Sequence, residues 1–271
     1  MKILDPCSSY GVALSELKDE CIAKDIKNLA PFFEHNKHAT FIRDDLRAPK
    51  HFFHPDIIIS GIPCRPFSSL NVRTKYEAHS EFDMFQYLMR YVAIEKPYVV
   101  VVENVPQFLK YFEQFKDYIP KPYKIVHINV YNYLDFGCNW NRKRAFIILS
   151  QTSLDIDMKQ YMEPSRTINE ILPDTIPQVV PKVPPSKFFH VCHDSGRRFI
   201  IYCSQFLKSF GTRSVIYCDN FGILNNEQIK KILDIKLDIS ILNYNQQMYL
   251  LANAIHPKFM KKLIDAIKKR I

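Results

Sequence analysis

Two short apolar runs each end in a residue that can do chemistry, one in a thiol and the other in a carboxyl. Pro63-Cys64 closes the run 56–62, and Glu103-Asn104 closes the run 98–102. Both runs are typical of buried strands, and ligands bind at the carboxyl ends of strands in open α/β sheets. A thiolate can add to an electron-poor ring carbon while a protonated carboxyl donates to a ring nitrogen. The pair therefore suits conjugate addition to a pyrimidine.

Two arginines open a later apolar run. Alternation along a strand would place the arginines of Asn141-Arg142-Lys143-Arg144 on one face. Their guanidinium groups could bind a base carbonyl, a phosphate or the carboxylate of Glu103. Each piece also has an ordinary structural explanation, because many buried cysteines are inert and charged residues are common on edge strands. Only the combination of the thiol, the carboxyl and the two arginines predicts a catalytic site.

Strand-like and helical segments alternate through the first 150 residues, which predicts a doubly wound parallel sheet. A helix is expected over 81–94, and the last two strands are expected to form an antiparallel hairpin at one sheet edge. Seven strands ending in a hairpin are typical of Rossmann-like methyltransferases, although the pattern alone leaves dehydrogenases open. The expected strands are 2–5, 20–24, 39–43, 56–60, 98–102, 123–131 and 144–150.

The texture of the sequence changes after residue 164. Prolines between 164 and 185 mark an irregular connection, and the aromatic and β-branched runs 199–202 and 215–217 predict a small β-rich module. A helix capped by an asparagine is expected to end at Ile232. After Pro257 an amphipathic helix closes the chain, with apolar residues on one face and lysines on the other.

Composition narrows the class of protein. No apolar run approaches the ~20 residues that span a membrane, and 1–5 already resembles a strand, so we expect neither an anchor nor a signal peptide. The 7 cysteines include no CxxC pair, which argues against a disulfide framework and a zinc site. We therefore expect an intracellular, reducing compartment, either cytoplasm or nucleus, and no metal.

The net charge of +9 favours a polyanionic partner. Basic residues concentrate between 181 and 213, against a single acid, and such a surface suits nucleic-acid phosphates. The alternative is an ordinary solvated face. The residues that we expect to contact nucleic acid in this stretch are Lys187, Arg197, Arg198 and Arg213.

Together these segments resemble the motifs of the DNA cytosine-5 methyltransferases. The family's Pro-Cys-Gln-x-Phe-Ser motif is similar to 63–68, and its Glu-Asn-Val motif is present at 103–105. Its Gln-x-Arg-x-Arg motif is similar to 140–144, where Trp140 replaces the glutamine. Its Gly-Asn-Ser-Val motif is similar to 252–255. The order and spacing of the motifs agree over nearly the whole chain.

The resemblance implies S-adenosylmethionine as cofactor. The family's Asp-x-Phe-x-Gly-x-Gly-Gly loop corresponds to 5–12, where Ser9 and Val12 replace two glycines. It also implies that Asp25 binds the ribose hydroxyls and that Asp45 accepts from the adenine amino group, each with an apolar neighbour. The implied cofactor-binding residues are Asp5, Cys7, Ser9, Gly11, Asp25, Ile26, Asp45, Leu46, Pro63, Met84 and Asn253.

The resemblance further implies a mechanism in which the target cytosine swings out of its helix. Cys64 attacks C6, Glu103 protonates or hydrogen-bonds N3, and C5 takes the methyl group. The loop 68–80, with Arg73 and Lys75, is expected to close over the substrate. The implied catalytic residues are Cys64, Glu103, Asn104, Arg142 and Arg144.

The predicted fold is α/β, with a Rossmann-like methyltransferase sheet of seven strands and a small β-rich target-recognition module. We expect residues 1–165 with 245–271 to form the catalytic and cofactor-binding domain and 166–244 the recognition region. The expected substrate is DNA, with no membrane association and a monomeric chain. Three alternatives stay open: a tRNA cytosine-5 methyltransferase, a nucleic-acid-binding relative without turnover, and a nicotinamide-dependent oxidoreductase. The last lacks GxGxxG and leaves Cys64 and Glu103 unexplained.

Overall fold

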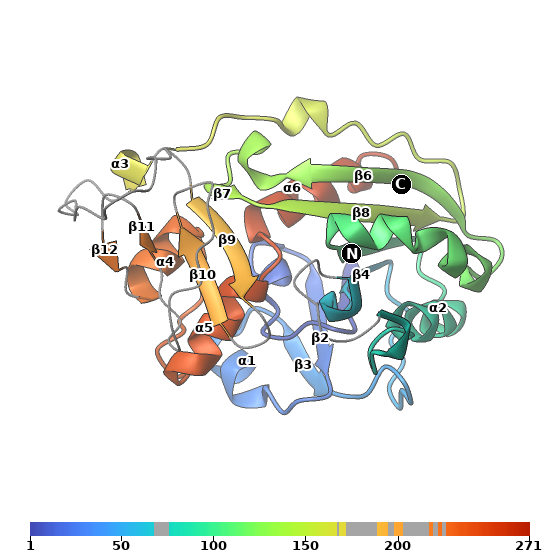
Figure 1. Cartoon of the computed structure of the whole chain (residues 1–271). Helices are drawn as coiled ribbons and strands as arrows, with labels where there is room; N and C mark the ends of the chain where they lie inside the picture. Colours follow the sequence, from blue (N-terminus) through green and yellow to red (C-terminus); the bar gives the residue numbers. More distant parts are fainter. Residues whose placement is uncertain are drawn as a thin grey trace.

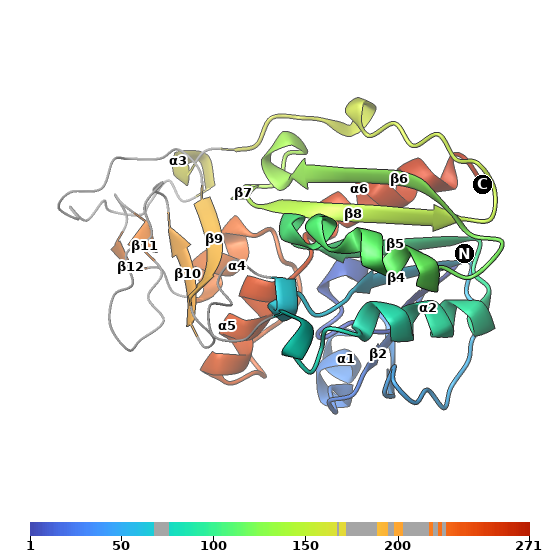
Figure 2. The same cartoon turned by 45° about the vertical axis from the view of Figure 1, so that its right-hand side comes forward.

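A seven-stranded mixed sheet lies at the centre of the molecule, in the order β3-β2-β1-β4-β5-β8-β6 (Figures 1 and 2). The structure is a computed structural model and describes residues 1–67, 76–166, 168–171, 189–194, 198–202, 217–218, 222–223 and 226–271. The strands of this sheet are β1 (Lys2–Asp5), β2 (Glu20–Asp25), β3 (Thr40–Arg43), β4 (Ile57–Gly61), β5 (Val99–Asn104), β6 (Lys124–Asn132) and β8 (Lys143–Ser150).

The five strands from β3 to β5 pair in parallel, whereas β8 is antiparallel to both β5 and β6. The prediction of seven strands with an antiparallel edge hairpin is thus confirmed. Observed and expected strand ends differ by at most two residues. The difference matters at β5, which continues through Asn104, so Glu103 and its neighbour lie inside the strand.

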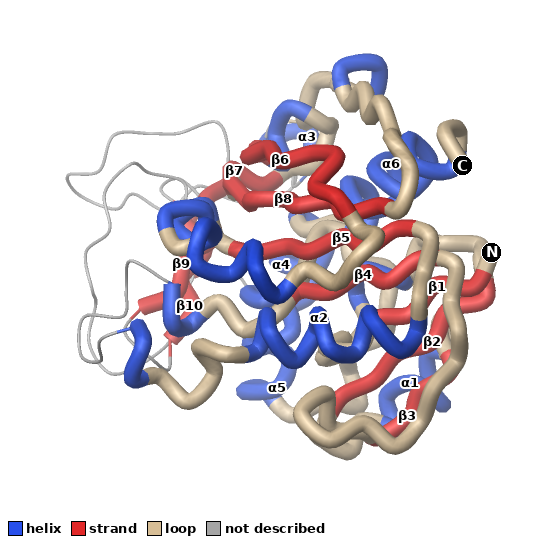
Figure 3. Tube along the Cα trace, turned by 90° about the vertical axis from the view of Figure 1, so that its right-hand side faces the viewer, coloured by secondary structure: helices blue, strands red, loops and turns tan. Residues whose placement is uncertain are grey.

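Helices cover both faces of the sheet, and α2 and α6 lie on opposite sides (Figure 3). Alternate residues of each central strand face the two layers: Ile57 and Ile59 face the α6 side, and Ile58 faces the α2 side. Burial of both faces explains why these strands appear in the sequence as continuous apolar runs. The helices are α1 (Ala30–Asn36), α2 (Met84–Glu95), α3 (Ile168–Ile171), α4 (Asn226–Ile232), α5 (Tyr244–Asn253) and α6 (Pro257–Lys268).

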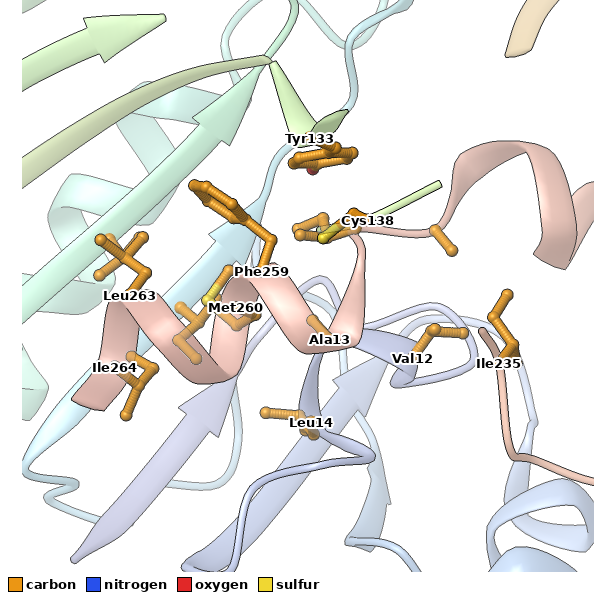
Figure 4. Packing of buried hydrophobic residues seen from close by; sticks show 14 of the residues in the cluster. Val12, Ala13, Leu14, Tyr133, Cys138, Ile235, Phe259, Met260, Leu263 and Ile264 are labelled. Atoms are coloured by element: carbon orange, nitrogen blue, oxygen red, sulfur yellow. The ribbon is translucent and has the colours of Figure 1, made fainter. Parts of the chain in front are cut away.

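The closing helix α6 packs against the short 3-10 helix η1 (Val12–Leu14), which follows the first strand (Figure 4). Its buried face contains the apolar residues expected from the helical spacing: Phe259, Met260, Leu263, Ile264 and Ile267. The lysines of its other face do not all point freely into solvent. Lys262 pairs with Glu163, and Lys268 pairs with Asp19. The two ends of the chain therefore share one core.

A second sheet has the order β12-β11-β10-β9-β7, and β9 and β10 lie beside α5 (Figures 1 and 2). It is the small β-rich module expected from the sequence. Its first strand, β7, comes from the edge hairpin of the main sheet. The boundary between a catalytic domain and a recognition region remains a prediction. The strands are β7 (Trp140–Asn141), β9 (Phe189–Asp194), β10 (Arg198–Tyr202), β11 (Tyr217–Cys218) and β12 (Gly222–Ile223).

The expected placement of both arginines on one strand is wrong for Arg142, which lies between β7 and β8. The physical reason is that β7 pairs with β9 of the second sheet, whereas β8 pairs with β5 and β6. The chain passes from one sheet to the other at this residue. Among the described helices, none combines the length and the apolar character needed to cross a bilayer.

Candidate active site

The thiol of Cys64 lies in the short connection between β4 and the 3-10 helix η2 (Arg65–Phe67). Ile62 before it and Phe67 after it are both buried, and the Phe67 N–H donates to the Cys64 carbonyl at 3.0 Å. The Phe67 ring packs edge-on against Phe108, with ring centroids 4.8 Å apart. The buried side chains of Ile62 and Phe67 therefore fix the backbone on either side of Cys64, which is itself half-buried.

The carboxyl of Glu103 comes from the neighbouring strand, where Glu103 is in register with Gly61 of β4. Arg144 on β8 donates from Nε to the Glu103 Oε1 at 2.9 Å, and both side chains are largely buried. Gly61 permits this packing, because a Cβ there would meet Ile255 at 3.0 Å and the Glu103 Oε2 at 3.4 Å. The parallel pairing of β4 and β5 thus brings the predicted thiol and carboxyl to one sheet edge.

Burial shapes the titration of both groups. It raises the pKa of the Cys64 thiol, and the positive charges of Arg144 and Arg142 oppose that rise. It also raises the pKa of Glu103 above its ordinary value, again against the two arginines. A carboxyl that keeps its proton to higher pH is suited to act as a general acid. The arginines at the same time favour the thiolate that a nucleophilic attack requires.

Arg142 is buried on the connection between β7 and β8, and its backbone N–H donates to the Asn132 Oδ1 at 3.1 Å. Its guanidinium acts electrostatically on both Glu103 and Cys64. The prediction that Arg142 lies near the site agrees with the structure, but the predicted reason, alternation with Arg144 along one strand, does not. The connection between β7 and β8 brings Arg142 to the site instead.

Asn104 is fully buried beside the nucleophile loop. Its Nδ2 donates to the Ile62 carbonyl at 3.3 Å, and its Oδ1 accepts from the Val105 N–H at 2.8 Å. The side chain therefore ties the end of β5 to the backbone just before Pro63. This geometry suits a residue that positions Cys64, and the catalytic role that the resemblance implies for Asn104 stays a prediction.

The loop after β1 contains the residues expected to bind the cofactor. Asp5 accepts from the Cys7 N–H at 3.1 Å, and Ser9 donates its N–H to the Asp25 Oδ2 at 3.0 Å. Ser9 and Gly11 both have positive φ, 48° and 63°. A Cβ at Gly11 would come within 2.7 Å of the Phe33 ring, so packing as well as conformation requires glycine there.

The replacement of a family glycine by Val12 is accommodated in the core. Val12 is buried in the apolar cluster that α6 covers, so its side chain points away from the strand ends (Figure 4). Ser9 adopts the left-handed conformation that a glycine would have, at a cost of roughly 1–2 kcal/mol. Both departures from the family pattern therefore preserve the course of the backbone.

Three carboxylates converge on the half-buried thiol of Cys7. Asp5, Asp25 and Asp45 lie at or just after the ends of β1, β2 and β3, and all three raise the pKa of Cys7, behind the larger effect of burial. Three acids close to one thiol suit a ligand that carries positive charge. This donor set fits S-adenosylmethionine, which has a sulfonium and an amino group.

The remaining predicted residues occupy varied environments. Leu46 and Met84 are buried in the apolar layer on the α2 side, whereas Ile26 is exposed. Pro63 is half-buried, and Asn253 ends α5, where its Nδ2 donates to the Tyr249 carbonyl at 2.9 Å. Their roles in binding the cofactor stay predictions.

Tyr249 is a site residue that the sequence did not single out. Burial raises its pKa, Arg65 opposes that rise, and Asp25 and Cys64 both contribute, so the phenol interacts electrostatically with the cofactor half and with the nucleophile. Lys27 Nζ lies 4.7 Å from its ring centroid. The available signal was its position four residues before Asn253, on the same helix face.

The expected nucleic-acid contacts largely lie outside the described residues, namely Arg73, Lys75, Lys187, Arg197 and Arg213. Arg198 begins β10, where its backbone pairs with Asp194. The structure describes its backbone and not its side chain.

A buried ionic network supports the loop that contains Asp45. Lys24 Nζ lies 2.7 Å from the Asp44 Oδ2, with the two side chains only 1% and 2% exposed. Lys24 also donates to the His51 carbonyl and the Tyr91 hydroxyl. Asp44 in turn accepts from the backbone N–H groups of residues 45, 50 and 51. Burial alone would raise the pKa of Asp44, but these donors lower it overall.

We expect Lys24→Met to lower the free energy of unfolding by about 3–5 kcal/mol at pH 7, because it leaves the Asp44 carboxylate buried and unpaired. A depressed pKa stabilises the fold above the unfolded pKa and loses that effect as the pH falls. The difference between variant and wild type should therefore shrink toward pH 4 in urea titrations. Lys236→Met breaks an exposed pair with Glu16 and should change stability by less than about 1 kcal/mol. Equal losses in both variants would contradict this account.

The seven-stranded sheet with its antiparallel edge hairpin is the fold of the Rossmann-like methyltransferases. A model of the family described as C-5 cytosine-specific DNA methylase matches residues 9–195, more than half of the chain. The chain belongs to this family, whose members use S-adenosylmethionine as methyl donor.

Individual proteins support the same assignment. Type II methyltransferase M.Bsp6I of Bacillus sp. (strain RFL6) is 29% identical over 130 residues, 45% of this chain and 41% of that relative. Type II methyltransferase M.HhaI of Haemophilus parahaemolyticus is 27% identical over 165 residues, 59% of this chain and 47% of the relative. The chain thus spans less than half the length of these relatives. The methyltransferase EhMeth of Entamoeba histolytica has a similar fold, with a TM-score of 0.68, 15% identity and coverage of 99% and 98% of the two chains.

Binding of S-adenosylmethionine at pH 7 is expected to release a proton from Asp5. Burial raises the pKa of this carboxyl to about 8, and a nearby cation would favour its ionised form. Affinity should therefore increase as the pH rises toward 8. Calorimetry in phosphate and in Tris should give different apparent enthalpies at pH 7, and Asp5→Asn should remove the difference. Identical enthalpies for the wild type in the two buffers would contradict the prediction.

Proposed function

We propose that this protein transfers a methyl group from S-adenosylmethionine to C5 of a flipped-out cytosine in DNA, through a covalent bond between Cys64 and C6. The observation that supports this proposal most directly is the convergence of Glu103 on β5, Arg144 on β8 and Cys64 just after β4. A thiol, a buried carboxyl and a guanidinium are the groups that addition to a cytosine ring requires.

Each residue has a defined task in this scheme. The Cys64 thiolate forms a bond to C6 while Glu103 gives a proton to N3, so the electron pair of the C5–C6 double bond becomes available at C5. Arg144 orients the Glu103 carboxyl through its ion pair, and Asn104 fixes the loop before Cys64. S-adenosylmethionine, which the residues after β1, β2 and β3 would hold, would supply the electrophilic methyl group for C5 and leave as the neutral thioether when its methyl–sulfur bond breaks. Loss of the C5 proton to solvent and of the N3 proton to Glu103 then expels Cys64 and restores the aromatic ring.

The base must leave its stack for this chemistry, because its ring carbons are inaccessible inside a duplex. Arg65 follows the nucleophile directly, and its side chain is 66% exposed at 3.6 Å from Glu81. We assign to Arg65 a contact with the backbone phosphate of the extruded nucleotide. Such contacts position a protein on nucleic acid without reading its sequence.

The test is a methylation assay with S-adenosylmethionine and an equimolar mixture of duplex DNA and unmodified tRNA, read at base resolution. We expect 5-methylcytosine in the DNA. Methylation of tRNA alone would replace the proposed substrate and keep the proposed chemistry. Unmodified cytosines in both, despite cofactor binding, would reject the activity.

A tRNA substrate is the second candidate, and the compact recognition region favours it. Only residues 172–225 separate α3 from α4, and the strands described within them, β9 to β12, are short. A module of this size has little surface with which to read base edges in a duplex groove. A third possibility, a binding protein without turnover, predicts no heat of binding with S-adenosylmethionine in calorimetry.

A further inference from the structure

Trp140 lies directly against one of the two arginines of the site. The Arg142 Cζ is 5.4 Å from the centroid of the Trp140 ring, and the two side chains are 6% and 0% exposed. We propose that Trp140 is a positioning residue that fixes the Arg142 guanidinium beside Cys64 and Glu103 through a cation–π contact. This inference rests on the proposed function and concerns how the same site is assembled.

A tryptophan at this position reduces the stability of the fold unless the face of its ring makes a favourable contact. Trp140 is fully buried, and its indole N–H has no hydrogen-bond partner within the described part of the chain. An unsatisfied buried donor destabilises a fold, so phenylalanine would fill the space at lower cost. Tryptophan is the strongest of the aromatic partners for a guanidinium. The family pattern has a glutamine here, which offers no ring.

Neighbouring rings fix the orientation of the indole. His256 and Tyr133 contact Trp140 edge-on, with ring centroids 5.2 and 6.1 Å away. Burial lowers the pKa of His256 to about 3, so the imidazole is neutral at physiological pH. It therefore adds no further positive charge to those of Arg142 and Arg144. The charged or titratable groups that act on Arg142 are Arg144, Tyr133, Glu103 and Cys64.

Both arginines have a partner that orients them. Arg144 is fixed by its ion pair with Glu103, and the Arg142 guanidinium contacts the face of the Trp140 ring. A ring attracts a cation without neutralising its charge. The contact therefore leaves the positive charge of Arg142 able to favour the Cys64 thiolate and the Glu103 carboxylate. Loss of the ring should weaken this electrostatic effect and leave the cofactor half untouched.

The test measures the titration of Cys64 without any turnover. Iodoacetamide alkylation of the Cys64 peptide is followed by mass spectrometry from pH 6 to pH 10 in wild type and in three variants. Trp140→Leu and Trp140→Gln should raise the apparent pKa of Cys64 by about half a unit or more, and Trp140→Phe should raise it less. Turnover on the substrate should fall about tenfold in the first two, with an unchanged KM for S-adenosylmethionine.

Matched controls separate positioning from general loss of packing. Phe85→Leu removes an equally buried ring on the opposite face of the sheet and should leave the Cys64 titration unchanged. Arg142→Met should raise the pKa of Cys64 as Trp140→Leu does, and the double variant should show no further rise. If Trp140→Leu does not fold, Trp140→Phe provides the same test. Its effect on the pKa of Cys64 should then disappear when Arg142→Met is also present.

A Cys64 titration unchanged by loss of the ring would overturn the proposal, even if turnover fell. Shifted alkylation in a protein that methylates neither DNA nor tRNA would support the positioning role and reject the proposed function.

Discussion

Replacing Cys64 with alanine is expected to abolish methyl transfer while leaving S-adenosylmethionine binding intact. The thiolate is the only group in the scheme that forms a bond to C6, and loss of a covalent nucleophile costs on the order of 10⁶ in kcat in a well-studied hydrolase. Binding should persist because the cofactor half is built from the strand ends of β1, β2 and β3. Radiolabelled methyl incorporation and calorimetry measure the two properties separately.

The matched control is Cys21→Ala, which removes a buried thiol of β2 away from the nucleophile loop. This variant should lose some stability and keep its turnover. Measurable methyl transfer by Cys64→Ala, beyond the background of a mock preparation, would refute the covalent mechanism. Loss of both binding and turnover would instead indicate a folding defect, and circular dichroism distinguishes that case.

Trapping the covalent adduct between Cys64 and the target cytosine is a second test of the role of Cys64. When fluorine replaces hydrogen at C5 of the target cytosine, the last step cannot occur, because fluorine does not leave as a cation. The wild type should then form a stable adduct between Cys64 and the nucleic acid, visible as a mass increase on that peptide. Cys64→Ala should form none. An adduct on any other residue would redirect the assignment of the nucleophile.

Much of the fold was predictable because the main sheet is buried on both faces. Continuous apolar runs mark β4 and β5 in the sequence, and their carboxyl ends must meet when the strands pair in parallel. That pairing brings Cys64 and Glu103 together and requires no further information. The hairpin of β6 and β8 was predictable for a different reason: the two strands are close in sequence, and such strands commonly pair in antiparallel fashion.

Other features depend on contacts between distant segments and could not be predicted. The two-residue strand β7 has no periodicity, yet its pairing with β9 moves Arg142 out of the main sheet. The burial of Val12 under α6 depends on the end of the chain packing against its beginning. Tyr249 approaches the nucleophile only because α5 returns to the strand ends. In each case the sequence showed the residue but not its neighbours.

The pH dependence of turnover should expose Glu103 as the second essential group. The reactive form needs a Cys64 thiolate and a protonated Glu103, and the pKa of each is raised by burial. Between the two pKa values the pair shares one proton, and the reactive arrangement is a minor isomer of that state. Turnover should therefore rise with pH through the lower pKa and fall again through the higher one.

Glu103→Gln should lower turnover at neutral pH by about 10²–10⁴, because an amide can donate a hydrogen bond to N3 but cannot transfer a proton. The falling limb should also disappear, so that activity rises until Cys64 is ionised and then stays constant. The midpoint should lie below the upper wild-type pKa, since the negative charge of Glu103 raises the pKa of the thiol. Glu163→Gln breaks ion pairs with Lys258 and Lys262 elsewhere on the molecule and should keep the bell shape. A bell-shaped profile in Glu103→Gln would assign the falling limb to a different acid and remove Glu103 from the mechanism.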